Sequence, residues 1–258
     1  MEAVRSKDGT PIAFERSGEG PALVIVGGPF DTRLSSRELT PLLANNYTVY
    51  EYDRRGRGDS GNSPIYSIER EVEDLAAIVT VAGGSAYLYG HDSGGALALE
   101  AASRGVHANK VAVWEPPYTA DNIGDGGSSE LLEQVGGQVA AGDNDRAAEV
   151  FLEGSGTTAE SIELMKVGPE WARIRALAPT LVYDLTLRNH GFVPVERFSS
   201  IHVPTIAFAG GTSPEWAARA ARVIAGAIPD AIHETVDTEN HDPDARTLAT
   251  LLTEYFRG

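Results

Sequence analysis

Residues 85–100, which decide the fold of this chain, read SAYLYGHDSGGALALE. An apolar, strand-like run meets a tight turn bounded by glycines, and a segment typical of a helix follows at once. Gly90, Gly94 and Gly95 allow the strand and the helix to pack closely, which leaves Asp92 at the strained apex of the turn. Because the apex is also the start of the helix, the helix dipole stabilises negative charge there. The stretch therefore predicts a strand, a sharp turn that presents a reactive side chain, and a helix.

The alternation of strand and helix patterns continues through most of the chain. Strand-like segments lie at residues 22–26, 48–52, 85–89, 110–114, 205–209 and 231–236, and helix-like segments at 36–44, 68–81, 94–104, 214–227 and 244–256. Two short alternating segments, residues 2–6 and 11–16, flank a Lys-Asp-Gly-Thr turn and predict a hairpin. The expected fold class is α/β, with a mostly parallel sheet, an N-terminal hairpin and helices on both faces.

The alternation is interrupted between residues 118 and 200. This part contains no convincing strand, and helix-like stretches lie at residues 129–141, 146–152, 161–167 and 170–188. We interpret residues 118–200 as a helical lid inserted in a core formed by residues 1–117 and 201–258. A lid would exclude water and shape a pocket. The alternative is a helical layer with no part in catalysis.

Composition limits the classes of function. The 258 residues include no cysteine, which excludes disulfides, thiolate metal sites and cysteine nucleophiles. The formal net charge of −16 disfavours nucleic acid and anionic lipid as partners. Neither a signal peptide nor an apolar stretch of about 20 residues is visible, so we expect a cytoplasmic protein that does not bind membranes. No nucleotide-binding motif appears, and we expect a small-molecule substrate, no cofactor and no metal, with a homodimer left open.

Two motifs carry a family resemblance. Residues 90–94 read GHDSG, and residues 53–60 read DRRGRGDS. The first resembles the nucleophile elbow of the α/β-hydrolase family, Gly-x-nucleophile-x-Gly, and the second is similar to the family's D-x-R-G-x-G-x-S loop. The order of strand, elbow, helical insertion, two strands and histidine also fits this family over nearly the whole chain. The resemblance implies the α/β-hydrolase fold.

The elbow residue is the main point of interest, because most members of this family carry serine there. Asp92 instead resembles the aspartate of epoxide hydrolases and haloalkane dehalogenases. A carboxylate is ionised at neutral pH and can attack an sp³ carbon without help from a base. A histidine then activates water, which hydrolyses the resulting ester. Two alternatives stay open: Ser93 is the nucleophile if the turn is read one residue later, or Asp92 replaces a lost serine and does not attack.

The resemblance also implies a histidine base and a supporting acid. His241 lies between the last strand-like segment and the last helix, where the family places its base. The other histidines are His91, His107, His190, His202 and His233. The loop after residues 206–209 reads GGTS and lacks the family's usual acid. Glu115 follows an earlier strand, at the position that certain dehalogenases and the zearalenone lactonases use, and Asp237 and Glu239 are the fallback.

The oxyanion site departs from the family pattern. The residue after the glycine of the first loop usually donates its N–H, but here it is Pro29, which has none. The N–H groups of Ser93 and Phe30 are therefore the expected donors. Since loss of one such donor typically costs roughly 10²–10³ in rate, the departure makes a non-hydrolytic reaction more credible. Ser93 also stands where dehalogenases carry a tryptophan halide donor, which disfavours dehalogenation.

Several further residues are candidates for substrate binding. They are Pro29, His91, Tyr118, Trp171, Tyr183 and His190. Epoxide hydrolases use lid tyrosines to protonate the opening oxygen, which makes Tyr118 and Tyr183 candidates for that role. A lone aromatic residue on a helix more often serves packing. The arginines of residues 54–57 could suggest a phosphate site, but in this fold they are usually tied to nearby carboxylates.

Taken together, these features predict an epoxide-hydrolase-like enzyme that acts on a small apolar substrate with Asp92, His241 and Glu115. The runner-up is a non-hydrolytic member, a cyclase, isomerase or lyase, in which Asp92 is an acid or a base. A ligand-binding protein without turnover is the third alternative.

Overall fold

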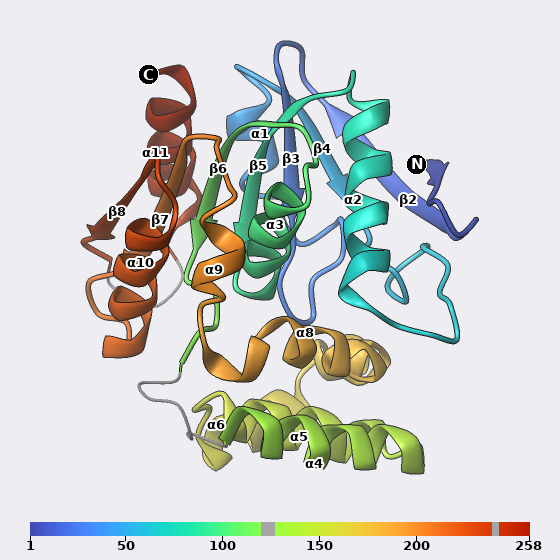
Figure 1. Cartoon of the computed structure of the whole chain (residues 1–258). Coiled ribbons are helices and arrows are strands. Elements are labelled where there is room, and N and C mark those ends of the chain that lie inside the picture. Colours follow the sequence, from blue (N-terminus) through green and yellow to red (C-terminus); the bar gives the residue numbers. More distant parts are fainter. Residues whose placement is uncertain (120–126, 239–242) are drawn as a thin grey trace.

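The computed structural model describes residues 1–119, 127–238 and 243–258, and these ranges contain one eight-stranded sheet (Figure 1). The strands are β1 (Glu2–Arg5), β2 (Pro11–Ser17), β3 (Ala22–Val26), β4 (Thr48–Tyr52), β5 (Ala86–His91), β6 (Ala108–Trp114), β7 (Thr205–Gly210) and β8 (Ala231–Val236). Their order in the sheet is β1-β2-β4-β3-β5-β6-β7-β8. The pairs β1–β2 and β2–β4 are antiparallel, and every later pair is parallel.

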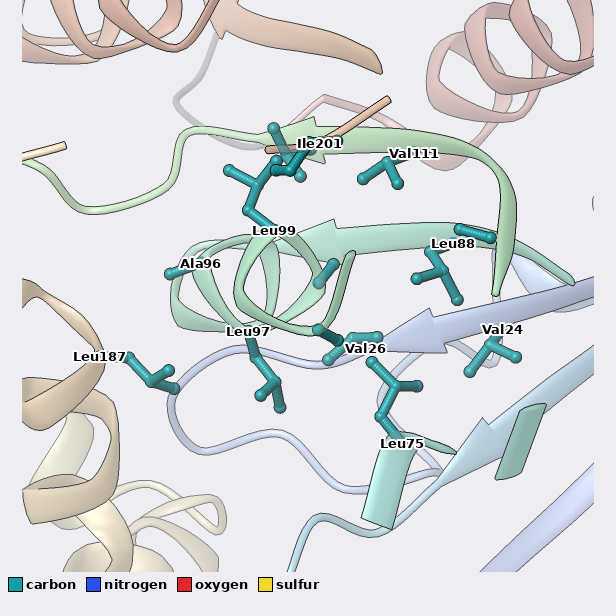
Figure 2. Close-up of a cluster of buried hydrophobic side chains, with 14 of the residues drawn as sticks. Val24, Val26, Leu75, Leu88, Ala96, Leu97, Leu99, Val111, Leu187 and Ile201 are labelled. Carbon is teal, nitrogen blue, oxygen red and sulfur yellow. The ribbon is translucent and has the colours of Figure 1, made fainter. Parts of the chain in front are cut away.

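Successive side chains of the central strands point to opposite faces of the sheet, and helices cover both faces. On one face Val24 and Val26 pack with helices α2 (Ile68–Val81), α3 (Ser93–Ser103), α9 (Val195–Phe198) and α10 (Glu215–Ala227). Figure 2 shows Leu97 of α3 and Leu75 of α2 beside Val26. On the other face Leu23 and Ile25 pack with α1 (Thr40–Leu43) and α11 (Ala245–Arg257).

A group of helices lies beyond one end of the sheet (Figure 1). It consists of α4 (Gly127–Ala141), α5 (Asn144–Gly154), α6 (Ala159–Val167), α7 (Trp171–Leu177), the 3₁₀ turn Ala178–Thr180 and α8 (Leu181–Leu187). We call residues 127–191 the helical layer. Its own hydrophobic cluster includes Phe151, Ile174 and Leu185, and Phe30 from the loop after β3 packs against that cluster. The layer therefore has a core of its own and touches the sheet domain at the β3 loop.

The predicted fold class is confirmed, including the hairpin and the helices on both faces. Two predicted helices differ. The segment predicted at residues 36–44 is helical only over Thr40–Leu43, since Pro41 fits the first turn of a helix but not its interior. The helix predicted at residues 170–188 is broken at Ala178–Thr180, where Pro179 has no N–H to donate. The short helix α9 was not predicted.

No helix within the described residues combines the length and the apolar character needed to span a bilayer. The role of residues 118–200 as a lid stays a prediction, since the helical layer shows their architecture and not their motion.

Candidate active site

Asp92 occupies the turn between β5 and α3. Its backbone has φ 49° and ψ −122°, a conformation that non-glycine residues rarely adopt. A Cβ on Gly94 would lie 2.1 Å from the Val26 carbonyl oxygen, and one on Gly90 would lie 2.4 Å from the Gly94 carbonyl oxygen. The glycines on either side of Asp92 are therefore required by close backbone contacts. The turn has the strained geometry that the sequence predicts for a nucleophile elbow.

The environment of Asp92 opposes its ionisation. Burial raises the pKa of this carboxyl above its ordinary value of 3.8, and the charge of Asp184 adds to the rise. The positive charges of Arg188 and His91 act in the opposite direction, as does the Ser93 N–H. That N–H donates to the Asp92 Oδ1 at 2.5 Å, so Asp92 caps its own helix. The net result is a carboxyl that holds its proton to higher pH than a solvated aspartate does.

Glu115 lies at the carboxyl end of β6, with φ 44° and a nearly fully buried side chain. Its Oε1 accepts a hydrogen bond from the Gly210 N–H at 2.6 Å. A Cβ on Gly210 would lie 2.8 Å from the Thr238 Oγ1 and 3.3 Å from the Glu115 Oε1. The Glu115 carboxylate is therefore at the end of β7, where the family usually has its acid, and beside the segment that leads to residue 241.

The predicted base, His241, and the fallback acid Glu239 lie outside the described residues. The other fallback acid, Asp237, is exposed to solvent. An exposed carboxylate is screened by water and orients a histidine poorly, whereas a buried one with a backbone donor is held in place. Among the described candidates for the acid, the geometry favours Glu115.

We expect Glu115→Gln to lower kcat by about 10²–10⁴-fold, because a neutral amide no longer stabilises the charged imidazole. Asp237→Asn is the matched control and should leave kcat unchanged within about twofold. Steady-state kinetics on both variants, with circular dichroism to verify the fold, test this assignment. Equal losses in the two variants would contradict it.

The loop after β3 lies directly beside the elbow. A Cβ on Gly28 would lie 3.0 Å from the His91 carbonyl oxygen and 3.2 Å from the Asp92 Cβ. Phe30 has φ 59°, and no described residue accepts its N–H. Pro29 supplies no donor. The Phe30 N–H thus has no acceptor among the described residues and belongs to the loop that contacts the elbow at Gly28, while the Ser93 N–H is engaged by the Asp92 carboxylate itself. The oxyanion role of both groups stays a prediction.

The Ser93 side chain has a structural partner. Its hydroxyl donates to the Asp184 Oδ1 of α8 at 2.5 Å and accepts from the Arg54 Nη1 at 3.0 Å. Ser93 is fully buried. A hydroxyl with both roles satisfied and no exposure is a poor nucleophile, which argues against the alternative register of the elbow. The same bonds attach the helical layer to the elbow.

The arginines of residues 54–57 are tied to buried carboxylates, as the structural interpretation predicts. Arg54 pairs with Glu71 at 2.7 Å and with Asp184 at 2.8 Å. Arg57 pairs with Asp184 at 2.7 Å, and Arg55 pairs with Asp74 at 2.7 Å. We call the group Arg54, Arg57, Glu71 and Asp184 the elbow ion cluster. Its charges compensate one another, so it offers no phosphate site.

Tyr183 and Trp171 make packing contacts. The Tyr183 ring stacks on Tyr66 with centroids 3.9 Å apart, and its hydroxyl accepts from the Asn62 Nδ2 at 3.0 Å. The Trp171 indole donates to the Asp145 carboxylate at 2.7 Å, and its ring belongs to the cluster of the helical layer. These contacts match the packing alternative that the sequence left open for both residues.

Tyr118 and His190 have similar surroundings. Tyr118 is buried against Phe198 in the core of the sheet domain, where burial raises the pKa of its hydroxyl well above 10. His190 is exposed, and its Nδ1 lies 2.8 Å from the Ser129 Oγ. Neither has a hydrogen bond to Asp92 within the described part of the chain. Their roles in substrate binding stay predictions, as does that of the half-buried His91.

The structure adds one residue that sequence reasoning missed. Arg188 follows the last residue of α8, is only 7% exposed, and places its guanidinium carbon 5.4 Å from the centre of the Phe151 ring. Its charge acts on Asp92, whose pKa it lowers against the effect of burial. No sequence signal marks it, because an arginine at the end of a helix is most often a solvated surface residue.

Within the described ranges, no group of three or more histidine, aspartate or glutamate side chains could hold a metal ion.

The sequence profile described as the alpha/beta hydrolase family matches residues 22–251 of the chain. A solved structure of an alpha/beta hydrolase from Sphaerobacter thermophilus is similar, with 39% identity, a TM-score of 0.91 and coverage of 99% of this chain and 100% of that one. The enol-lactonase from Burkholderia xenovorans shares the fold at 18% identity and a TM-score of 0.76, each chain being fully covered. An esterase from a Rhodococcus species does so at 18% identity and a TM-score of 0.69, with coverage of 100% and 98%. No curated protein matches the chain.

Proposed function

The chain belongs to the alpha/beta hydrolase family, and from that premise we propose that it is a hydrolase whose nucleophile is Asp92 and whose substrates are small epoxides. The observation that carries the proposal is the position of this carboxyl. Asp92 is held at a strained apex at the N-terminus of α3, beside a loop that offers the Phe30 N–H. A serine at this apex would need a base to attack, whereas an aspartate needs none.

The proposed reaction has two steps. A carboxylate oxygen of Asp92 bonds to an epoxide carbon, the carbon–oxygen bond of the ring breaks, and the released oxygen takes a proton from a nearby donor. His241 then removes a proton from water, which attacks the Asp92 ester carbonyl. The N–H groups of Phe30 and Ser93 stabilise the oxyanion, and its collapse breaks the bond to the diol oxygen, which takes back the proton that His241 removed from water. The Asp92 carboxyl then loses its proton to the group that protonated the epoxide oxygen, which restores the carboxylate.

Glu115 supports the second step. Its buried carboxylate stabilises His241 when the imidazole carries the proton taken from water. The hydrogen bond from the Gly210 N–H holds the Glu115 carboxylate at the end of β7. The Ser93 N–H bonds to the Asp92 carboxylate in the resting site, so esterification of that carboxylate would free this donor for the oxyanion.

Two observations favour a second candidate function. Burial raises the pKa of Asp92, which suits an acid that donates a proton more than a nucleophile that must be ionised. Pro29 also removes one oxyanion donor that hydrolysis of an ester would use. In this second candidate, a non-hydrolytic isomerase, cyclase or lyase, Asp92 transfers protons and forms no covalent intermediate.

Covalent trapping distinguishes the two candidates. We would incubate a His241→Gln variant with a panel of epoxides, alkyl halides and lactones, and record intact-protein and peptide mass spectra. Because this variant retains the attacking carboxylate but lacks the base for hydrolysis, we expect a mass gain equal to the epoxide on the peptide that contains Asp92.

The control for the trapping experiment is the double variant Asp92→Asn/His241→Gln, which should gain no mass. Labelling of the double variant would show that another residue reacts. Calorimetry identifies the compounds of the panel that bind the His241→Gln variant. If none of them forms an adduct, Asp92 is not a nucleophile and the proton-transfer candidate remains.

A further inference from the structure

Arg188 is a buried cation for which the described residues supply no carboxylate at ion-pair distance. Four arginines in the described part of the chain are no more than 7% exposed: Arg54, Arg55, Arg57 and Arg188. The first three each bond to a buried carboxylate at 2.7–2.8 Å. For Arg188, no described carboxylate oxygen lies within ion-pair distance, and the one polar contact within the described ranges is the Ser155 Oγ at 3.3 Å. A buried guanidinium normally has a charged partner, because its desolvation is otherwise uncompensated.

Two aromatic rings connect the Arg188 guanidinium to the loop beside Asp92. It sits over the Phe151 ring, and Phe151 meets the Phe30 ring edge-on at 5.5 Å between centroids. Phe30 belongs to the loop beside Asp92. The two aromatic rings therefore form an apolar wall that runs from the elbow to the cation. The Arg188 charge also acts on Asp92, although the two groups are further apart than a direct ion pair.

The backbone that follows Arg188 is unusual. Asn189, His190 and Gly191 have φ values of 48°, 57° and 88°, three left-handed residues in succession. The Asn189 side chain bonds to the Phe192 carbonyl oxygen at 2.9 Å and holds the bend. Left-handed non-glycine residues are disfavoured and are found where the surrounding structure requires them, often near functional sites. The strained bend ends α8 with Arg188 directed into the helical layer rather than to solvent.

We propose that Arg188 binds the carboxylate of an anionic substrate, whose reactive carbon then faces Asp92. This inference rests on the proposed function for the reactive carbon, and it narrows the substrates to small carboxylic acids that carry an epoxide, such as 2,3-epoxy acids. A guanidinium fork matches a carboxylate in two parallel hydrogen bonds, which fixes the orientation of the substrate. It also offsets the repulsion between an anionic substrate and the Asp92 carboxylate.

The test uses unreactive ligands, so that it does not depend on turnover. We would measure the binding of 3-phenylpropionate and of the isosteric 3-phenylpropionamide to the protein by calorimetry. We expect the carboxylate to bind about 10- to 100-fold more tightly than the amide, as charge-assisted hydrogen bonds allow. Arg188→Met should abolish that preference, and Arg188→Lys should keep part of it, since lysine retains the charge without the fork. Arg175→Met, at an exposed arginine of the helical layer, is the matched control and should bind like the unmodified protein.

Two outcomes would overturn the anion site: equal binding of acid and amide to the unmodified protein, or an acid preference that survives in Arg188→Met. If Arg188→Met fails to fold, the comparison of the unmodified protein with Arg188→Lys decides. Equal affinity of these two proteins for 3-phenylpropionate would contradict paired hydrogen bonds from the Arg188 guanidinium. The Asp92→Asn variant tests the carboxylate site at Arg188 independently of the proposed nucleophile. It should bind the acid at least as tightly, because a repelling charge is removed, whether or not Asp92 is a nucleophile.

Discussion

Asp92→Asn is expected to lower turnover by about 10⁴-fold or more, because an amide neither attacks carbon nor exchanges a proton at neutral pH. Asparagine is the suitable replacement, since it tolerates the left-handed backbone at φ 49° and its oxygen can accept the Ser93 N–H. Initial rates on the substrate class that labels the His241→Gln variant measure the loss. Turnover within tenfold of the unmodified protein would exclude Asp92 from the chemistry.

The same substitution is expected to raise Tm by a few degrees at pH 7. The folded-state pKa of Asp92 is raised above 3.8, so its ionisation at neutral pH weakens the folded state. Asparagine removes that cost. The gain should shrink as the pH falls through the raised pKa of Asp92 and disappear below about 3.9, where aspartate is protonated in both the folded and unfolded states.

Calorimetric melting of Asp92→Asn between pH 3 and pH 8 measures this gain, with the exposed Asp237→Asn as control. A gain independent of pH would mean that the electrostatic account is wrong. An acid limb of kcat/KM above the ordinary aspartate range would agree with the raised pKa, since activity that needs the carboxylate falls as Asp92 is protonated.

Asp184→Asn is expected to cost about 3–5 kcal/mol of unfolding free energy and roughly 10 °C in Tm. The substitution keeps the shape of the side chain and an acceptor for Ser93, but it leaves buried Arg54 paired only with Glu71 and buried Arg57 without a carboxylate among the described residues. Burial acts to raise the pKa of Asp184, but the charges of Arg57 and Arg54 outweigh it and hold that pKa below 3.8. Its contribution to stability is present above the unfolded pKa and is lost as the pH falls through the lowered one.

The control for Asp184→Asn is Glu153→Gln, which breaks an exposed ion pair with Arg146 in the same helical layer. It should change the unfolding free energy by less than about 0.5 kcal/mol. Urea unfolding followed by circular dichroism gives both values. Equal stability of the two variants would show that the elbow ion cluster does not hold the helical layer on the sheet domain.

The residues that determine the fold could be identified before the structure, because their signals are local. The unbroken apolar run Ala22–Val26 and the helical spacing over Ile68–Val81 follow from how a strand covered on both faces and a helix present side chains to a core. The glycines around Asp92 predicted a tight turn because only hydrogen fits between the backbones there. Helix boundaries were less accurate where proline intervened, at Pro41 and Pro179.

The candidate site residues differ in how clearly the sequence marks them. Glu115 was proposed as the acid because the loop after β7 contains none, and the structure places its carboxylate at the end of that strand, bonded to the Gly210 N–H 95 residues away along the chain. Tyr183 and Trp171 looked equally suitable as pocket residues; the structure gives them contacts with Tyr66 and Asp145, and their role in substrate binding stays a prediction. An aromatic side chain carries the same sequence signal in a pocket and in a core.

The sequence by itself determined the order of strands and helices, the strained turn and the identity of its carboxyl, because backbone sterics and burial patterns act over a few residues. Only the tertiary structure decided the electrostatics of that carboxyl. Asp184 and Arg188 lie on or next to the same helix and resemble surface residues in sequence, but folding buries both near Asp92. The pKa of Asp92 depends on these distant groups and on lost hydration, and neither is a property of the residues around it in the chain.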